Sequence, residues 1–265
     1  MLISSIFLFI LRHPRTTWTS TSTSNPAARI LDEDQAKMTY TFTTNSHPPA
    51  LLTNKTLVYP TLANPTRTSN NHPVFNHAMH IRHAVFIEEQ GCNPDAEIDA
   101  DDARSWQYVI YANTTDTHDQ EERAVAVVRL VPPPHAPHEA LQEPARASEL
   151  PAFDVRHEPY VKITRVAVIK EFRGLGLAAK VMRAAEEWAA ENKESIDAMC
   201  RRVAGDDGID EQGKGWTGLV GLHAQVQVEK MYQRMGYETN HSMGTWDEEG
   251  IQHVGMFKRV DLVEK

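Results

Sequence analysis

The most regular pattern of apolar and polar residues lies between residues 162 and 191. Apolar and polar positions alternate through residues 162–168, which predicts a β-strand with one buried face. Apolar residues then return every third or fourth position from 177 to 191, which predicts an amphipathic helix. The glycine-rich segment 173–178 joins the two. Such a loop at a helix N-terminus presents free N–H groups and the positive end of the helix dipole, and it favours binding of a pyrophosphate group.

The same patterns predict the remaining elements and their order. Strands are expected at 56–59, 106–112, 124–130 and 216–224, helices at 74–90 and 226–235, and a closing β-hairpin at 237–243 and 254–258. Strands and helices therefore alternate irregularly along the chain. This order predicts a mixed sheet with helices packed on it, in the α+β or α/β class.

Polar and proline-rich segments set the expected domain limits. We expect residues 1–54 to be a disordered leader and residues 55–262 to form a single domain. Residues 93–102 are acidic and predict a surface loop, and residues 132–159 predict a long loop inserted between strands. This insert holds His135, His138 and His157, which are candidate metal ligands. Because nothing in the sequence fixes their geometry, a soluble loop is preferred and no metal is expected.

The composition of the 265-residue chain is that of a globular protein, and its formal net charge is −9. An acidic chain offers no electrostatic basis for nucleic-acid binding. Its two cysteines, Cys92 and Cys200, lie far apart in sequence, so neither a zinc site nor a disulfide framework is expected. A reducing, cytoplasmic compartment is the default expectation.

The first residues allow two interpretations of where the protein resides. Residues 2–11 form an apolar run that is too short to span a bilayer, and no membrane attachment is expected. No acidic residue precedes Asp32, and three arginines lie among many serines and threonines, which is typical of a mitochondrial transit peptide. We prefer a dispensable leader on a cytoplasmic protein, with mitochondrial import as the alternative.

The glycine-rich segment also fits the G-x-G-x-x-A pattern of dinucleotide-binding folds. In that fold the first glycine follows the strand almost directly, whereas residues 169–173 intervene here. An acidic residue at the end of a second strand is also expected about 20 residues further on. The predicted helix runs instead into residues 192–195, where no strand ends. A dinucleotide site is therefore the less favoured interpretation.

Three motifs resemble the GNAT superfamily of N-acetyltransferases. Segment 173–178 (RGLGLA) fits the pattern Arg/Gln-x-x-Gly-x-Gly/Ala, and segment 231–237 (MYQRMGY) resembles the family's tyrosine–glycine signature. Segment 85–91 (VFIEEQG) resembles the VFVxEQG helix end of a branch often named after glucosamine-phosphate N-acetyltransferases. The resemblance implies the acyl-CoA N-acyltransferase fold, with a mixed, mostly antiparallel sheet that is splayed at its central strands and has helices on both faces.

The resemblance also implies which residues bind acetyl-CoA. Backbone groups of the central strand would pair with the pantetheine arm, amides of the glycine-rich segment would hold the pyrophosphate, and Gln225 stands where the family often has asparagine. The expected cofactor-binding residues are Val166, Ala167, Val168, Arg173, Gly174, Leu175, Gly176, Leu177, Ala178 and Gln225. Tyr232 matches the family's usual acid, because a phenol stays protonated at neutral pH and can protonate the leaving thiolate.

The acceptor side of the site is expected near the end of the first predicted helix. Glu88 and Glu89 lie there, and His223 lies on a later strand; all three are candidates for binding the acceptor. Glu89 is the first choice for the base that deprotonates the amine, and His223 is another. Solvated surface glutamates and a strand-end histidine remain the alternative interpretation of these residues.

The expected reaction is transfer of an acetyl group from acetyl-CoA to a primary amine by direct attack in a ternary complex. A small-molecule amine is the preferred acceptor. A protein N-acetyltransferase and a non-catalytic, acyl-CoA-binding regulatory relative are the alternatives. The sequence leaves open the identity of the acceptor and whether the chain forms a homodimer.

Overall fold

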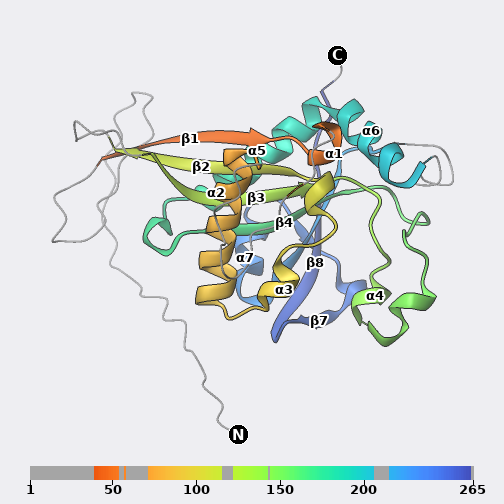
Figure 1. Ribbon diagram of the computed structural model, residues 1–265. Coiled ribbons are helices and arrows are strands. Elements are labelled where there is room, and N and C mark those ends of the chain that lie inside the picture. The colour runs from red at the N-terminus through yellow and green to blue at the C-terminus, as the bar shows by residue number, and fades with distance from the viewer. Residues whose placement is uncertain are drawn as a thin grey trace, which may run out of the picture.

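The computed structural model describes residues 39–53, 57, 71–114, 122–142, 144–205 and 215–263, and its strands form one mixed sheet (Figure 1). The described strands are β1 (Tyr40–His47), β2 (Trp106–Thr114), β3 (Glu122–Val131), β4 (Val161–Val168), β5 (Leu219–Gln225), β6 (Glu238–Thr239), β7 (Thr245–Glu248) and β8 (Ile251–Arg259). Their order is β1-β2-β3-β4-β5-β8-β6, with β7 paired to β8. Among them only β4 and β5 pair in parallel, so the predicted mixed, mostly antiparallel sheet is confirmed.

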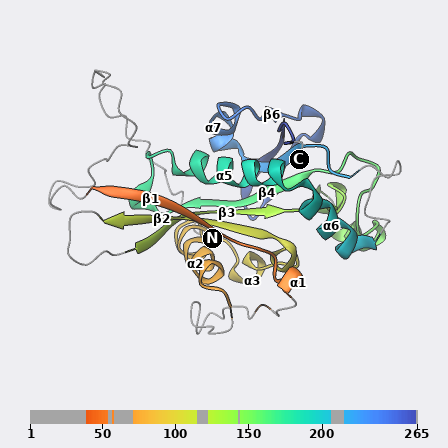
Figure 2. The ribbon, with the colours of Figure 1, turned by 90° about the horizontal axis from the view of Figure 1, so that it is seen from above.

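Helices cover both faces of this sheet (Figure 2). One face carries α5 (Leu177–Glu191) and α7 (Glu229–Gln233), and the other carries α1 (Ala50–Thr53), α2 (Pro73–Arg82) and α3 (Pro94–Glu97). The other helical segments are η1 (His83–Glu89, a π-helix), η2 (Asp102–Arg104), α4 (Glu139–Gln142), η3 (Pro144–Glu149), η4 (Lys170–Phe172), α6 (Lys193–Ala204), η6 (Val226–Val228) and η7 (His241–Met243).

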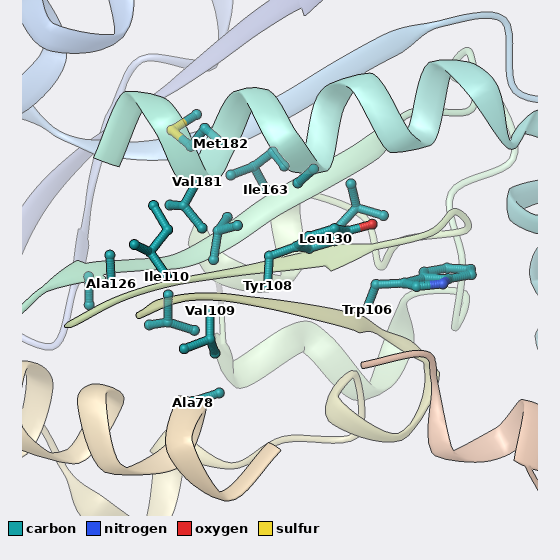
Figure 3. Packing of buried hydrophobic residues seen from close by; sticks show 14 of the residues in the cluster. Ala78, Trp106, Tyr108, Val109, Ile110, Ala126, Leu130, Ile163, Val181 and Met182 are labelled. Atoms are coloured by element: carbon teal, nitrogen blue, oxygen red, sulfur yellow. The ribbon is translucent and has the colours of Figure 1, made fainter. Parts of the chain in front are cut away.

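The strands β2 and β3 are buried on both faces because they lie between these helix layers. Their near-continuous apolar runs lack the alternation of a strand with one wet face. Val181 and Met182 of α5 pack on one face of the sheet, and Ala78 of α2 packs on the other (Figure 3). This core holds α5, and with it the glycine-rich loop at its N-terminus, against the central strands.

The start of the domain differs from the prediction. The strand expected at 56–59 lies almost entirely outside the described residues, as does 1–38 of the expected leader. Within that leader, however, β1 pairs antiparallel with β2 along its whole length, from Tyr40 opposite Thr114 to His47 opposite Gln107. The boundary at residue 55 is therefore corrected, and the described fold begins with β1. As a half-exposed edge strand, β1 carries little apolar sequence signal.

Other elements also depart from their predicted limits, and one helix is not predicted at all. The helix expected at 74–90 begins at Pro73, capped by His72, and changes to π-helix at His83. The strand expected from 216 begins at Leu219, because the Trp216 N–H donates to Asp197 (2.8 Å) rather than to a neighbouring strand. The chain after Asn192 forms the helix α6, where no helix is predicted.

The acidic segment 93–102 is exposed or half-buried at every residue but the last, so the predicted surface loop holds only in part. Asp102 is buried and accepts hydrogen bonds from Arg82 (2.6 Å), and it lies 3.1 Å from the guanidinium of Arg129. Asp99 of the same segment makes two hydrogen bonds with Arg129. Burial alone raises the pKa of Asp102, but the charges of Arg82 and Arg129 hold that pKa well below its usual value. The end of the segment turns inward because the buried Arg82 and Arg129 bind Asp102.

We expect Asp102→Asn to lower the free energy of unfolding by about 3–5 kcal/mol, because the change leaves two buried guanidinium groups without their shared carboxylate. Urea denaturation of both proteins measures this. The matched control is Asp101→Asn: Asp101 pairs with Arg104 at a partly exposed position, and such a pair is typically worth about 1 kcal/mol or less. Equal losses from the two variants would contradict the assignment of Asp102 as the buried anchor.

Candidate functional site

The two parallel strands β4 and β5 separate in the middle of the sheet. They pair at three positions only, and the last pair joins Ile163 to Leu222. Beyond it, β4 continues to Val168 and β5 to Gln225 without pairing to each other. The predicted splay of the central strands is therefore present, and backbone groups on this side of β4 are available to a ligand.

A β-bulge in β4 accompanies the separation. Thr164 lies opposite Arg129 and Ala167 opposite Val127, so β4 has one residue more than β3 over this stretch. The bulge includes Arg165, whose φ of +53° is unusual for a residue with a side chain. Its guanidinium is held by Glu97 (3.1 Å) and by Asp99 (3.2 Å). These ion pairs offset the strain of the backbone, which is on the order of 1–3 kcal/mol.

The direction of the β4 backbone decides which predicted contacts are open. The Ile169 N–H donates to the Val125 carbonyl of β3 (2.9 Å). Since backbone groups of an extended strand alternate in direction, Ala167 also faces β3, whereas Val166 and Val168 face the splay. Of the three residues expected to pair with a pantetheine arm, only Val166 and Val168 are therefore suitably directed.

The glycine-rich loop ends at the N-terminus of α5. Gly174 and Gly176 adopt φ values of +79° and +73°, which favour glycine, and a Cβ at Gly176 would have no protein atom within 4 Å. No hydrogen bond from the N–H groups of residues 174–178 is found within the described chain, whereas the Arg173 N–H donates to the Lys170 carbonyl (3.2 Å). The free amides therefore begin at Gly174, one residue later than predicted.

The π-helical segment η1 meets this loop and the end of β5. The Arg173 guanidinium donates two hydrogen bonds of 2.6 Å to the Glu89 carboxylate, and its Nε donates to the Val168 carbonyl (2.9 Å). Gln225 donates to Gln90 (3.3 Å) across the mouth of the splay. A π-helix is often found at functional sites. Here it brings the end of the first long helix to both separated strands.

The two candidate glutamates occupy different environments. Hydrogen bonds from Arg173 lower the pKa of Glu89, and both carboxylate oxygens are bound by that arginine. This makes Glu89 a weaker base than a free carboxylate would be. Glu88 is largely exposed and lies 3.3 Å from His83 of its own helical segment, so the structure does not bring it into the site. The base role of Glu89 stays a prediction, and the ion pair does not favour it.

Tyr232 of α7 can donate a proton. Its side chain is 7% exposed and packs edge-on against Tyr237, with ring centroids 6.1 Å apart. Burial raises the pKa of Tyr232 to about 12, so the phenol stays protonated at neutral pH. Within the described residues its hydroxyl makes no hydrogen bond, whereas the hydroxyl of Tyr237 donates to Glu186 (2.7 Å). Of the two adjacent tyrosines, Tyr232 is therefore the one with an available donor.

A second cluster lies on the opposite face of the sheet from α5. His223 of β5 pairs through Nδ1 with Glu248 of β7 (2.7 Å), and the Trp246 indole donates to the same carboxylate (2.6 Å). Lys162 of β4 lies nearby: its charge lowers the pKa of His223, and the charge of Glu248 raises the pKa of Lys162. Of these four residues, only His223 is a candidate from the sequence. Lys162 could also have been chosen from the sequence, because it begins the predicted central strand. Trp246 and Glu248 could not, because only the tertiary fold brings them close to Lys162.

The three histidines of the proline-rich insert do not come together. His135 bonds to the Tyr160 carbonyl (2.9 Å), His157 bonds to Asp154 (2.7 Å), and His138 packs against Trp246. No group of three potential metal ligands is found among the described residues. Nor does any helix in the described ranges have the length and apolar character needed to cross a membrane.

Comparisons with known proteins find one family match and a set of similar solved structures. Residues 78–203 match the model of the acetyltransferase (GNAT) family, a segment that includes β4, the glycine-rich loop and α5. One similar solved structure is an acyl-CoA N-acyltransferase from Pseudomonas aeruginosa, with 21% identity over 83% of this chain and 99% of that chain, and a TM-score of 0.45. A second is Escherichia coli ElaA, with 21% identity over 70% of this chain and 89% of that chain, and a TM-score of 0.41. A third is the AHL synthase LasI, with 14% identity over 86% of this chain and 99% of that chain, and a TM-score of 0.44.

Proposed function

We propose that this protein moves an acetyl group from acetyl-CoA to a primary amine. The match of residues 78–203 to the acetyltransferase (GNAT) family is the starting point of this proposal. The observation that carries the proposal is the meeting of two open backbone surfaces. Free amides at the N-terminus of α5 lie at the end of β4, and that strand has separated from its parallel neighbour. One surface suits a pyrophosphate, and the other suits an amide-containing arm.

The proposed cofactor path runs from the α5 loop into the splay. The amides of residues 174–178 and the helix dipole would hold the pyrophosphate. The backbone groups of Val166 and the N–H of Val168 would pair with the pantetheine arm, since the Val168 carbonyl already accepts from Arg173. Gln225 would add a contact at the mouth of the splay. The open space above Gly176 supports this fit, because a phosphate needs close approach to the backbone. The donor that we propose is acetyl-CoA, which carries a small acyl group.

In the proposed reaction the neutral acceptor amine attacks the thioester carbonyl. The new C–N bond forms as the C–S bond breaks, and the departing thiolate takes the proton of the Tyr232 hydroxyl. The raised pKa of Tyr232 keeps that proton in place until charge develops on sulfur. The amine's surplus proton leaves to a base on the acceptor side. For Glu89 we propose a positioning role, because its carboxylate links η1 to Arg173 of the cofactor loop.

The proposal is tested by cofactor binding and thiol release. Acetyl-CoA at about 100 times its Kd stabilises a folded protein by about 2.7 kcal/mol, which for a chain of this size raises Tm by about 5–10 °C. We expect that shift with acetyl-CoA and not with NAD, and we expect free thiol to accumulate when acetyl-CoA is mixed with an accepting amine from a panel. A shift with NAD and none with acetyl-CoA would refute the proposal.

A further inference from the structure

The cluster of Lys162, His223 and Glu248 lies at the point where the splay begins. Lys162 is paired with Gly221 one step before the last pair of β4 and β5. His223 is the first residue of β5 beyond that pair. Lys162 and His223 lie on the sheet face opposite the α5-facing core residues Ile163 and Leu222. Side chains of the cluster therefore border the space into which the proposed thioester would extend.

The imidazole of His223 is oriented with one nitrogen available. Its Nδ1 is bound to Glu248, which fixes the tautomer with the proton on that nitrogen. Burial, followed by the charge of Lys162, lowers the pKa of His223 to about 4, so the ring is neutral at physiological pH. The Nε2 atom makes no hydrogen bond with the described residues, and it is not sealed from solvent. A neutral ring with a free Nε2 lone pair can accept a hydrogen bond from an amine.

Lys162 is a half-buried cation without a direct partner among the described residues. Burial lowers its pKa to about 8, so it remains mostly charged at neutral pH. The charged groups around it are already engaged. Glu248 binds His223 and Trp246, Asp101 binds Arg104 (2.8 Å), and Arg129 and Arg165 bind Asp99. The ammonium group is therefore available to an anion from outside.

We infer that this cluster binds an acceptor amine that also carries a carboxylate, with Lys162 donating to the carboxylate and His223 Nε2 accepting from the amine. The two groups lie on neighbouring strands, so one small molecule can reach both. The proline-rich insert closes this side, because His138 packs edge-on against Trp246 (centroids 4.4 Å apart) and α4 lies beside β7 (Figure 1). The inference rests on the proposed function and narrows its acceptor to amino-acid-like molecules.

A purely structural role for Lys162 would be to balance the charge of Glu248. The charge of Glu248 does raise the pKa of Lys162, but the two form no ion pair within the described chain, because His223 and Trp246 hold the Glu248 carboxylate. The structural role predicts that replacing Lys162 changes stability and leaves acceptor choice unchanged. The two roles are therefore separated by measuring acceptor choice rather than activity alone.

The experiment compares amino acids with their α-carboxamides as acceptors for acetyl-CoA, by thiol release. A charge-assisted hydrogen bond to the carboxylate should give the best amino acid a kcat/KM about 10–100 times that of its amide. Lys162→Met should bring this ratio close to one while the rate with the amide persists, and Lys162→Arg should retain most of the ratio. Lys193→Met, which removes a lysine on α6, should leave the ratio unchanged.

A second readout keeps the acceptor inference separate from the proposed function. The same amino acids and amides are added to the protein with saturating CoA, and the Tm shift is recorded. An amino acid that binds in a Lys162-dependent way without any thiol release would overturn the proposed reaction and keep the acceptor site. The inference is overturned if the wild-type protein uses the amino acid no better than its amide, or if Lys162→Met leaves the ratio of the two kcat/KM values unchanged. It is also overturned if the Tm shifts show equal binding of the amino acid and its amide.

Discussion

Replacing Tyr232 with phenylalanine should lower kcat by about 10²–10⁴-fold and leave the Kd for acetyl-CoA nearly unchanged. The ring keeps its place against Tyr237, so packing is preserved and only the hydroxyl is lost. Steady-state kinetics with the accepting amine give kcat, and thermal shift gives the affinity. The deficit should shrink with an acyl donor whose leaving thiol is more acidic, because that thiolate needs less protonation.

Tyr237→Phe is the matched control for this prediction. It removes a hydroxyl from the neighbouring ring, but that hydroxyl is bonded to Glu186, away from the proposed reaction. We expect Tyr237→Phe to reduce stability by about 1–3 kcal/mol, since it leaves a buried carboxylate short of a donor, and to change kcat little. If Tyr232→Phe keeps the wild-type kcat while chemistry limits the rate, Tyr232 is a packing residue and the acid lies elsewhere.

Replacing Gly176 with valine should abolish cofactor binding. A β-branched residue is strained at a φ of +73°, and its side chain would occupy the space in front of the free amides. Loss of two charge-assisted hydrogen bonds to the pyrophosphate would raise the Kd for acetyl-CoA by about 10²–10⁴-fold. The measurement is the Tm shift with acetyl-CoA, taken relative to the Tm of each variant alone.

Gly205→Val controls for backbone strain in that experiment. Gly205 also has a positive φ, of +64°, and open space around it, but it follows α6 rather than preceding α5. We expect the variant to be destabilised and to keep its full shift with acetyl-CoA. A normal shift in Gly176→Val would show that the pyrophosphate binds elsewhere.

The sequence predicted best the elements whose pattern is both long and strong. The strand at 162–168 and the helix at 177–191 appear almost as expected, because their apolar periodicity reflects burial on one face. Helix α6 was missed although Ile196, Met199 and Cys200 recur at helical spacing, because the charged and polar residues between them indicate the end of the preceding helix. The edge strand β1 could not be distinguished from a polar leader, since only one of its faces is partly covered.

The candidate site was predictable where it depends on local sequence. The glycine-rich loop and Tyr232 were found from motifs, and the fold places the loop and Gln225 around the splay. The bulge at Arg165 was not predictable, because the carboxylates that hold its side chain come from a segment almost 70 residues earlier in the chain. The pairing of His223 with Glu248 likewise requires β5 and β7 to meet across β8.

The unusual backbone of Arg165 has a consequence for how this sequence can diverge. Position 165 must tolerate a left-handed conformation, which excludes β-branched residues, and it must also neutralise Glu97 and Asp99. Glycine would satisfy the first demand and fail the second, whereas a lysine would meet the second with poorer geometry. Substitutions at 165 are therefore expected to be inherited together with changes at 97 and 99. Lineages that retain both acids should retain a long cationic residue between the two halves of β4.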